Sequence, residues 1–126
     1  MDTSSTFLTD CVSEEMSAGE AADSTRACWT EAEDALVPVI GRDGLGVLFR
    51  HGETVAIRNL GASGPLSSRQ SIDAFCDWVR GLKTEQAVAA CKMFLQSVES
   101  YLVSLVGAGS LRRILGRSRM LGGRFR

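Results

Sequence analysis

His51 is the only histidine in the chain and the residue best suited to chemistry near neutral pH. It lies in the segment VLFRHGETVAIRNLGA, residues 47 to 62. Its imidazole either takes part in a reaction that the protein carries out or is an ordinary polar side chain on a helix. The answer depends on where the side chain points, and therefore on the helix that carries it.

Helical geometry predicts that His51 is exposed. The apolar residues of its segment recur at helical steps, and His51 lies about 130° around the axis from the centre of their stripe. Guanidinium groups pair with phosphate oxygens, so an exposed histidine beside arginines could carry or receive phosphate. The alternative is a solvated histidine without a chemical role. The stripe consists of Leu45, Leu48, Phe49, Ala56 and Leu60, with Gly52 on the same side, and the candidate binding face consists of Val47, Arg50, Thr54, Val55 and Arg58.

His51 is followed nine positions later by Leu60, Gly61 and Ala62. This arrangement resembles histidine-containing phosphotransfer (HPt) domains, which place a phosphoacceptor histidine mid-helix with an apolar-Gly-Ala/Leu ending at that distance. The segment SIDAFCDWVRGLKTEQAVAACKMFLQSVESYLVSL also looks like the helical hairpin that follows the histidine helix in that family. The resemblance covers roughly residues 22 to 106. It implies a bacterial signalling protein in which His51 is the phosphoacceptor and a receiver domain is the partner.

Two positions depart from the HPt pattern. These domains usually carry a lysine three residues after the histidine and a glycine four after, where this chain has Thr54 and Val55. The lysine helps to hold phosphoryl charge and the glycine lets the receiver approach closely. Two functional classes therefore stay open. One is a two-component signalling module that transfers phosphate through His51 to and from receiver domains, and the other is a non-catalytic helical adaptor that binds a signalling partner.

The elements that position these residues are all expected to be helices. Four stripes of helical period, separated by glycines and capping residues, predict an all-α fold, an antiparallel four-helix bundle with a short C-terminal fifth helix. Phe94 and Leu102 are expected at the centre of its core. In chain order the expected helices are Ala21 to Gly41 with Pro38 in the last turn, Asp43 to Leu60, Ser67 or Ser68 to Gly81, a helix capped by Thr84 over about 85–106, and about 110–116.

Two of the helix corners have similar sequences. The segment LVPVIGRDGLGVLF (36–49) aligns without a gap with LVSLVGAGSLRRIL (102–115), and its Gly41 matches Gly107. Each segment reads as a helix end, a glycine break and a new helix. An old duplication would produce such a match, and so would any helix–Gly–helix corner with a buried stripe.

Charge is distributed unevenly along the chain. Residues 1–34 hold nine acidic residues against Arg26 alone, and residues 109–126 hold six arginines and no acid. We expect an acidic, disordered leader over residues 1–20, a helical domain over 21–117 and a basic, flexible tail over 118–126. The basic segment reads first as a solvated tail. Contact with nucleic acid or anionic lipid, the alternative, would use Arg112, Arg113, Arg117 and Arg119.

The sequence contains little that indicates an enzyme, a metal site or a cofactor site. No catalytic triad or glycine-rich phosphate loop is readable, so no independent catalytic activity, small-molecule substrate, metal or cofactor is predicted. No apolar run approaches the about 18 residues that a membrane helix needs. The cysteines, scattered without a C-x-x-C pair, suit buried free thiols in a reducing compartment, and we expect a cytoplasmic protein. They are Cys11, Cys28, Cys76 and Cys91.

Overall fold

The computed structural model describes residue 8, residues 11–60 and residues 72–115. These residues form helices without a strand, so the all-α prediction is confirmed. The expected start of the third helix at Ser67 or Ser68 and the expected tail over 118–126 lie outside the described residues. The helices are α1 (Ala18–Asn59), α2 (Ile72–Arg80), α3 (Thr84–Val106) and α4 (Ala108–Leu115).

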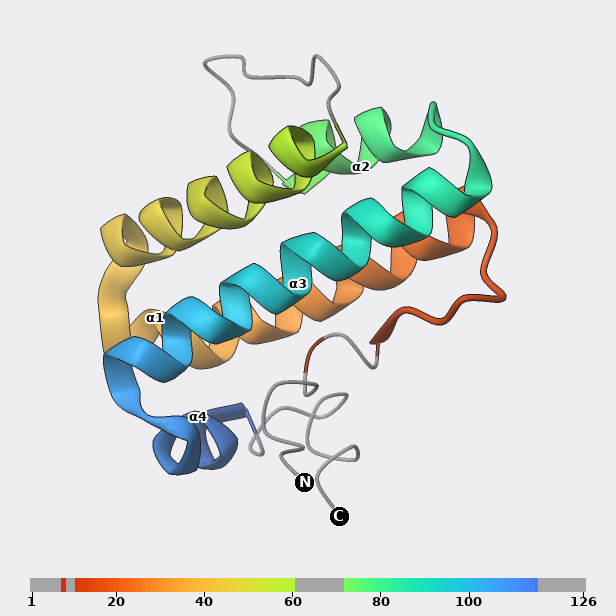
Figure 1. The fold of residues 1–126 in the computed structure, drawn as a ribbon. Helices are drawn as coiled ribbons and strands as arrows, with labels where there is room; N and C mark the ends of the chain where they lie inside the picture. The colour runs from red at the N-terminus through yellow and green to blue at the C-terminus, as the bar shows by residue number, and fades with distance from the viewer. Residues whose placement is uncertain (1–7, 9–10, 61–71, 116–126) are drawn as a thin grey trace.

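Helix α1 folds back on itself at Gly41, whose φ of 76° and ψ of 171° are not helical. The helix therefore has two arms, a first arm over residues 18–40 and a second arm over residues 42–59. The predicted break between the first two helices lies at this glycine, because only glycine adopts such a φ without steric cost. The second arm runs back along the first, and α3 runs beside them in the direction of the first arm (Figure 1).

Gly107, between α3 and α4, has nearly the same backbone conformation as Gly41, with φ 87° and ψ 151°. These two glycines are the residues with positive φ in the described part of the chain. Both corners lie at the same end of the molecule, and α2 lies toward the other end (Figure 1). The sequence match between the two corners therefore corresponds to a shared local structure, which either a duplication or a common packing requirement explains.

Two helix starts differ from the expected ones. The first arm begins at Ala18, where the Ser17 hydroxyl accepts a hydrogen bond from the Glu20 amide at 3.1 Å and the Glu20 carboxylate accepts one from the Ser17 amide at 2.9 Å. This reciprocal capping box starts the helix one turn before the predicted Ala21. Thr84 is the first residue of α3 instead of its cap, and Lys83 takes the cap position without a side-chain hydrogen bond.

The centre of the core is a cluster of four aromatic rings, one from each of four segments. Trp29 comes from the first arm, Phe49 from the second arm, Phe75 from α2 and Phe94 from α3. Their contacting ring centroids lie 4.8 to 6.5 Å apart, and all four side chains are buried. Phe94 and Leu102 are both fully buried, as predicted.

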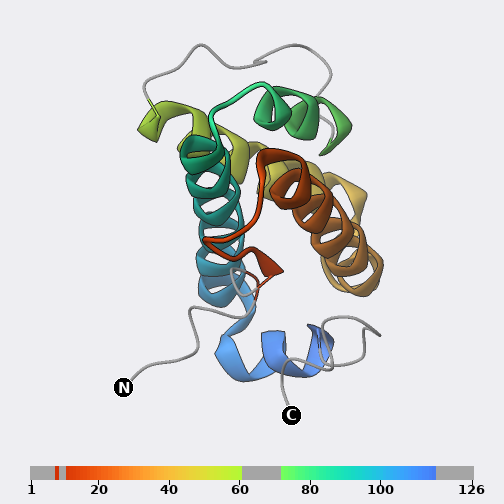
Figure 2. The same ribbon diagram turned by 90° about the vertical axis from the view of Figure 1, so that its right-hand side faces the viewer.

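Three described residues of the expected leader pack into the core, although a disordered leader was predicted over residues 1–20. Leu8, Cys11 and Val12 are buried with the helices, and the Leu8 amide donates to a carboxylate oxygen of Glu99 at 2.9 Å. The segment leading into α1 runs alongside α3 (Figure 2). Its few apolar residues lack a helical period because they pack from an irregular segment, and such packing leaves no periodic signal.

All four cysteines are free and buried, as predicted. The Cys76 thiol donates to the Ala22 carbonyl at 3.2 Å, and burial raises its pKa to about 12. The Cys91 thiol donates to the Ala21 carbonyl at 3.6 Å, and burial raises its pKa to about 11. These side chains therefore act as small apolar core residues at neutral pH.

Candidate functional site

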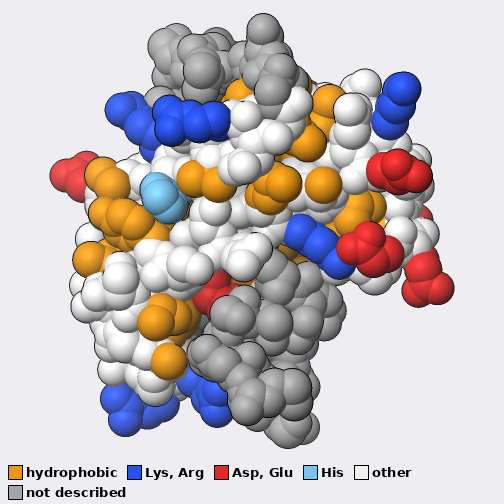
Figure 3. Space-filling view, in the orientation of Figure 1, with side chains coloured by type: hydrophobic (Ala, Val, Ile, Leu, Met, Phe, Trp, Pro, Cys, Tyr) orange, Lys and Arg blue, Asp and Glu red, His pale blue; other side chains and the backbone are white. Residues whose placement is uncertain are grey.

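His51 lies near the middle of the second arm, and its side chain is exposed, as helical geometry predicts. Leu48 and Phe49, three and two residues earlier in the arm, are buried. Figure 3 shows the imidazole on the surface of the molecule, with Lys or Arg side chains above it and hydrophobic side chains beside it. The residue is therefore accessible to a partner from solution.

The imidazole packs against Tyr101 of α3. The two ring centroids lie 5.1 Å apart and the ring planes are inclined by 45°. Tyr101 is half-buried, so this contact holds one side of the histidine ring and leaves the rest exposed. Sequence reasoning did not identify Tyr101 as a site residue, because its helical stripe indicated a core residue first.

Gly52 brings the second arm close to α3. A Cβ atom at this position would lie 2.8 Å from Phe94 Cδ1 and 2.8 Å from Val98 Cγ2, which is too close for any side chain. The glycine therefore allows the two helices to approach next to His51, and this approach lets the imidazole reach Tyr101. A buried glycine within a helical stripe was the signal for this contact.

The predicted binding face is only partly a polar surface. Arg50 and Arg58 are exposed, Thr54 and Val55 are half-buried, and Val47 is 55% exposed. The face therefore combines two cationic side chains with a solvent-exposed aliphatic one. Cationic side chains can hold phosphate charge, and an exposed aliphatic side chain can pack against a protein partner.

Glu53 is a buried carboxyl group that the sequence prediction missed. Its side chain is fully buried, and within the described residues neither carboxylate oxygen has a hydrogen-bond partner. Burial raises the pKa of this carboxyl, and the charge of Arg50 offsets part of the rise. Its position gives the signal that was passed over: it lies four residues after Phe49 and three before Ala56, within the buried stripe.

Other predicted sites are only partly visible. Arg112 and Arg113 are exposed on α4, whereas Arg117 and Arg119 lie outside the described residues. Among the residues that the structure describes, no cluster of histidine, cysteine and acidic side chains could hold a metal ion. None of the described helices combines the length and the apolar character needed to cross a membrane.

Comparisons of the chain with protein-family models, with curated proteins and with solved structures found no match.

Proposed function

We propose that the protein is a two-component signalling module that passes phosphate through His51 to and from receiver domains. The observation that carries the proposal is the placement of the chain's one histidine. Its ring is exposed in the middle of a rigid helical arm, is held on one side by Tyr101, and lies next to the exposed Arg50. A rigid support of this kind fixes the geometry of a nucleophile before the partner docks.

The transfer step requires only groups that the two proteins supply. A ring nitrogen of the neutral His51 imidazole attacks the phosphorus of the receiver's aspartyl phosphate, and a P–N bond forms while the P–O bond to the aspartate breaks. The bonding electron pair leaves with the aspartate carboxylate, and the surplus ring proton passes to water. The receiver supplies Mg²⁺, and Arg50 adds positive charge near the transferred phosphoryl group.

The arrangement of the helices supports the proposed similarity to HPt domains. The second arm runs opposite to the first arm and to α3 and supplies the antiparallel framework, α2 serves as the shorter fourth helix, and α4 is the short fifth one. Thr54 occupies the place of the lysine that HPt domains carry, so Arg50 and Arg58 are the cationic residues left for phosphate.

The test is transfer from receiver domains that have been phosphorylated with acetyl phosphate. The full chain should form an acid-labile, base-stable adduct, as a phosphoramidate does, and His51→Gln should abolish it. Thr54→Lys should increase the rate of transfer, because it adds positive charge one helical turn from the histidine. If none of the receivers encoded in the same genome transfers phosphate to His51, the phosphotransfer proposal is wrong.

The exposed Val47 favours the second candidate, a helical adaptor that binds a signalling protein without phosphate chemistry. Val47 lies one turn before His51, and with the half-buried Val55 it gives the face an aliphatic part. An adaptor would bind its partner equally well with His51→Gln and would lose affinity with Val47→Asp. Phosphotransfer predicts instead that His51→Gln abolishes transfer, so this variant separates the two functions.

A further inference from the structure

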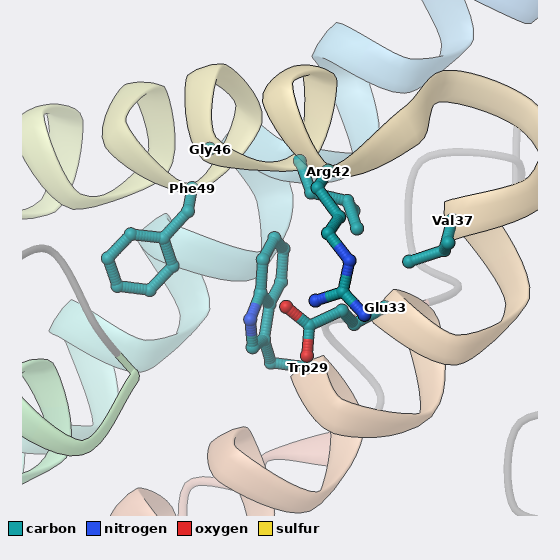
Figure 4. A pocket seen from close by; sticks show the side chains of 7 residues that line it. Trp29, Glu33, Val37, Arg42, Gly46 and Phe49 are labelled. Carbon is teal, nitrogen blue, oxygen red and sulfur yellow. The ribbon is translucent and has the colours of Figure 1, made fainter.

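A pocket of about 310 Å³ lies between the two arms of α1, beside the Gly41 bend and separate from His51. It is open to solvent, and its volume is near the lower end of the roughly 300–1,000 Å³ that is usual for ligand pockets, so it suits a small molecule. Its lining residues are Trp29, Glu33, Val37, Arg42, Leu45, Gly46 and Phe49 (Figure 4).

The pocket combines an apolar part with two opposite charges. Trp29 and Phe49 form the buried part, with ring centroids 5.4 Å apart, and Leu45 is buried with them. The carboxylate of Glu33 comes from the first arm and the guanidinium of Arg42 from the start of the second, and both extend into the same space (Figure 4).

Among the residues that the structure describes, neither charge is committed to another group. Within the described residues, Glu33 and Arg42 form no ion pair with each other or with any other side chain, whereas the structure pairs Arg26, Arg80 and Lys92 with acids. Glu33 is half-buried, and Arg42 is exposed. Two opposite charges that share a pocket without pairing are available to a ligand that carries both charges.

We propose that this pocket binds a free α-amino acid with a large apolar side chain, such as phenylalanine or leucine. The ligand's ammonium group pairs with Glu33, its carboxylate pairs with Arg42, and its side chain covers Trp29 and Phe49. A purely cationic ligand would be repelled by Arg42 and a purely anionic one by Glu33, whereas a zwitterion satisfies both. The proposal is independent of phosphotransfer, because none of these residues belongs to the face around His51.

Binding to the two arms at once also gives the ligand a structural effect. Glu33 and Arg42 lie on opposite sides of Gly41, so a molecule that bridges them adds a contact between the two arms to the core contact of Trp29 with Phe49.

The experiment is calorimetric titration of the full chain with L-phenylalanine and L-leucine at up to about 10 mM, the range of weak small-molecule affinities. We expect saturable binding of both and none of glycine. N-acetylphenylalanine lacks the ammonium charge and phenylalaninamide lacks the carboxylate, so each should bind at least about tenfold more weakly. No binding of either free amino acid, or equal binding of the blocked derivatives, would overturn the proposal.

Variants locate the site. Glu33→Gln and Arg42→Gln should each weaken binding at least about tenfold, while the exposed controls Asp34→Asn and Lys83→Gln should leave it unchanged. Gly46→Leu places a side chain in the pocket, where a Cβ atom at this glycine meets no atom within 4 Å, and should abolish binding while the thermal unfolding temperature stays near that of the unmodified chain. Binding that survives all three pocket variants would place the amino acid elsewhere and refute the assignment.

Discussion

The imidazole of His51 and the phenol ring of Tyr101 face each other across the contact between the second arm and α3, with centroids 5.1 Å apart. The contact joins the exposed candidate nucleophile to α3, the longest helix after α1. It means that the histidine ring has a defined orientation before any partner binds, although its surface remains accessible.

A double-mutant cycle measures this contact. His51→Ala and Tyr101→Ala should show a coupling free energy of about 0.5–1.5 kcal/mol, as tilted aromatic pairs do. His51→Gln alone should cost no more than about 1 kcal/mol, because an exposed ring has few other packing contacts to lose. Chemical denaturation of the four proteins gives the coupling, and a value near zero would show that Tyr101 does not orient the histidine.

Leu8 should contribute strongly to stability, although it lies near the N-terminus. Its side chain is fully buried and its amide is bonded to Glu99, so Leu8→Ala should lower the free energy of unfolding by about 2–5 kcal/mol. The matched control is Glu15→Ala in the same segment, where the side chain is exposed and a change below about 0.5 kcal/mol is expected. A loss below about 0.5 kcal/mol for Leu8→Ala as well would mean that Leu8 contributes nothing to the core.

Glu53→Gln should stabilise the protein increasingly as the pH rises. Burial raises the pKa of Glu53 in the folded state above its unfolded value of about 4.3. Between these two pKa values the folded state binds more protons than the unfolded state, so the wild-type free energy of unfolding falls as the pH rises. Below about pH 4 the carboxyl is protonated in both states, and the variant should gain little there.

Urea unfolding of both proteins from pH 4 to pH 8 measures this difference. The gain from Glu53→Gln should grow with pH and level off once the folded carboxyl has ionised. Asp34→Asn on the exposed surface is the control, with a difference of less than about 0.5 kcal/mol at each pH. A gain from Glu53→Gln that is constant with pH would show that Glu53 ionises alike in both states.

The centre of the core gives a prediction for helix α3. Phe94 and Leu102 are fully buried, and Phe94 contacts three of the other aromatic rings. Phe94→Ala and Leu102→Ala should each cost about 2–5 kcal/mol, whereas Leu105→Ala, at a residue 56% exposed, should cost less than about 0.5 kcal/mol. Thermal unfolding of the three variants checks this order.

Helical periodicity predicted the all-α fold, because α1, α2 and α3 bury apolar residues that recur at helical steps. The exposure of His51 follows from that period, and the break at Gly41 follows from the glycine that interrupts it. The burial of Leu8 and the burial of Glu53 do not follow from helical periodicity, for two different physical reasons. Leu8 packs from an irregular segment through tertiary contacts that no local pattern encodes, and Glu53 occupies a buried position with a polar residue, which a search for apolar stripes passes over.

The candidate sites were predictable to different degrees. His51 could be found because its residue type is unique in the chain and its helical position is computable. Tyr101 could not, because the distance between two helices depends on Gly52 and on the packing of α3 against it. The pocket at the bend could not be found either, because Glu33 and Arg42 approach each other only once the arms have folded back at Gly41.

The four buried thiols lie in four different segments, so their reactivity can report the local opening of each segment. Cys11 belongs to the segment before α1, Cys28 to the first arm, Cys76 to α2 and Cys91 to α3, and each is inaccessible in the folded state. A thiol reagent must reach the sulfur and reacts with its thiolate form. Each buried cysteine is therefore labelled only when its segment leaves the core. Alkylation followed by peptide mass spectrometry therefore times the opening of four separate segments in the natural sequence, and a ligand that joins the arms should slow the labelling of Cys28 first.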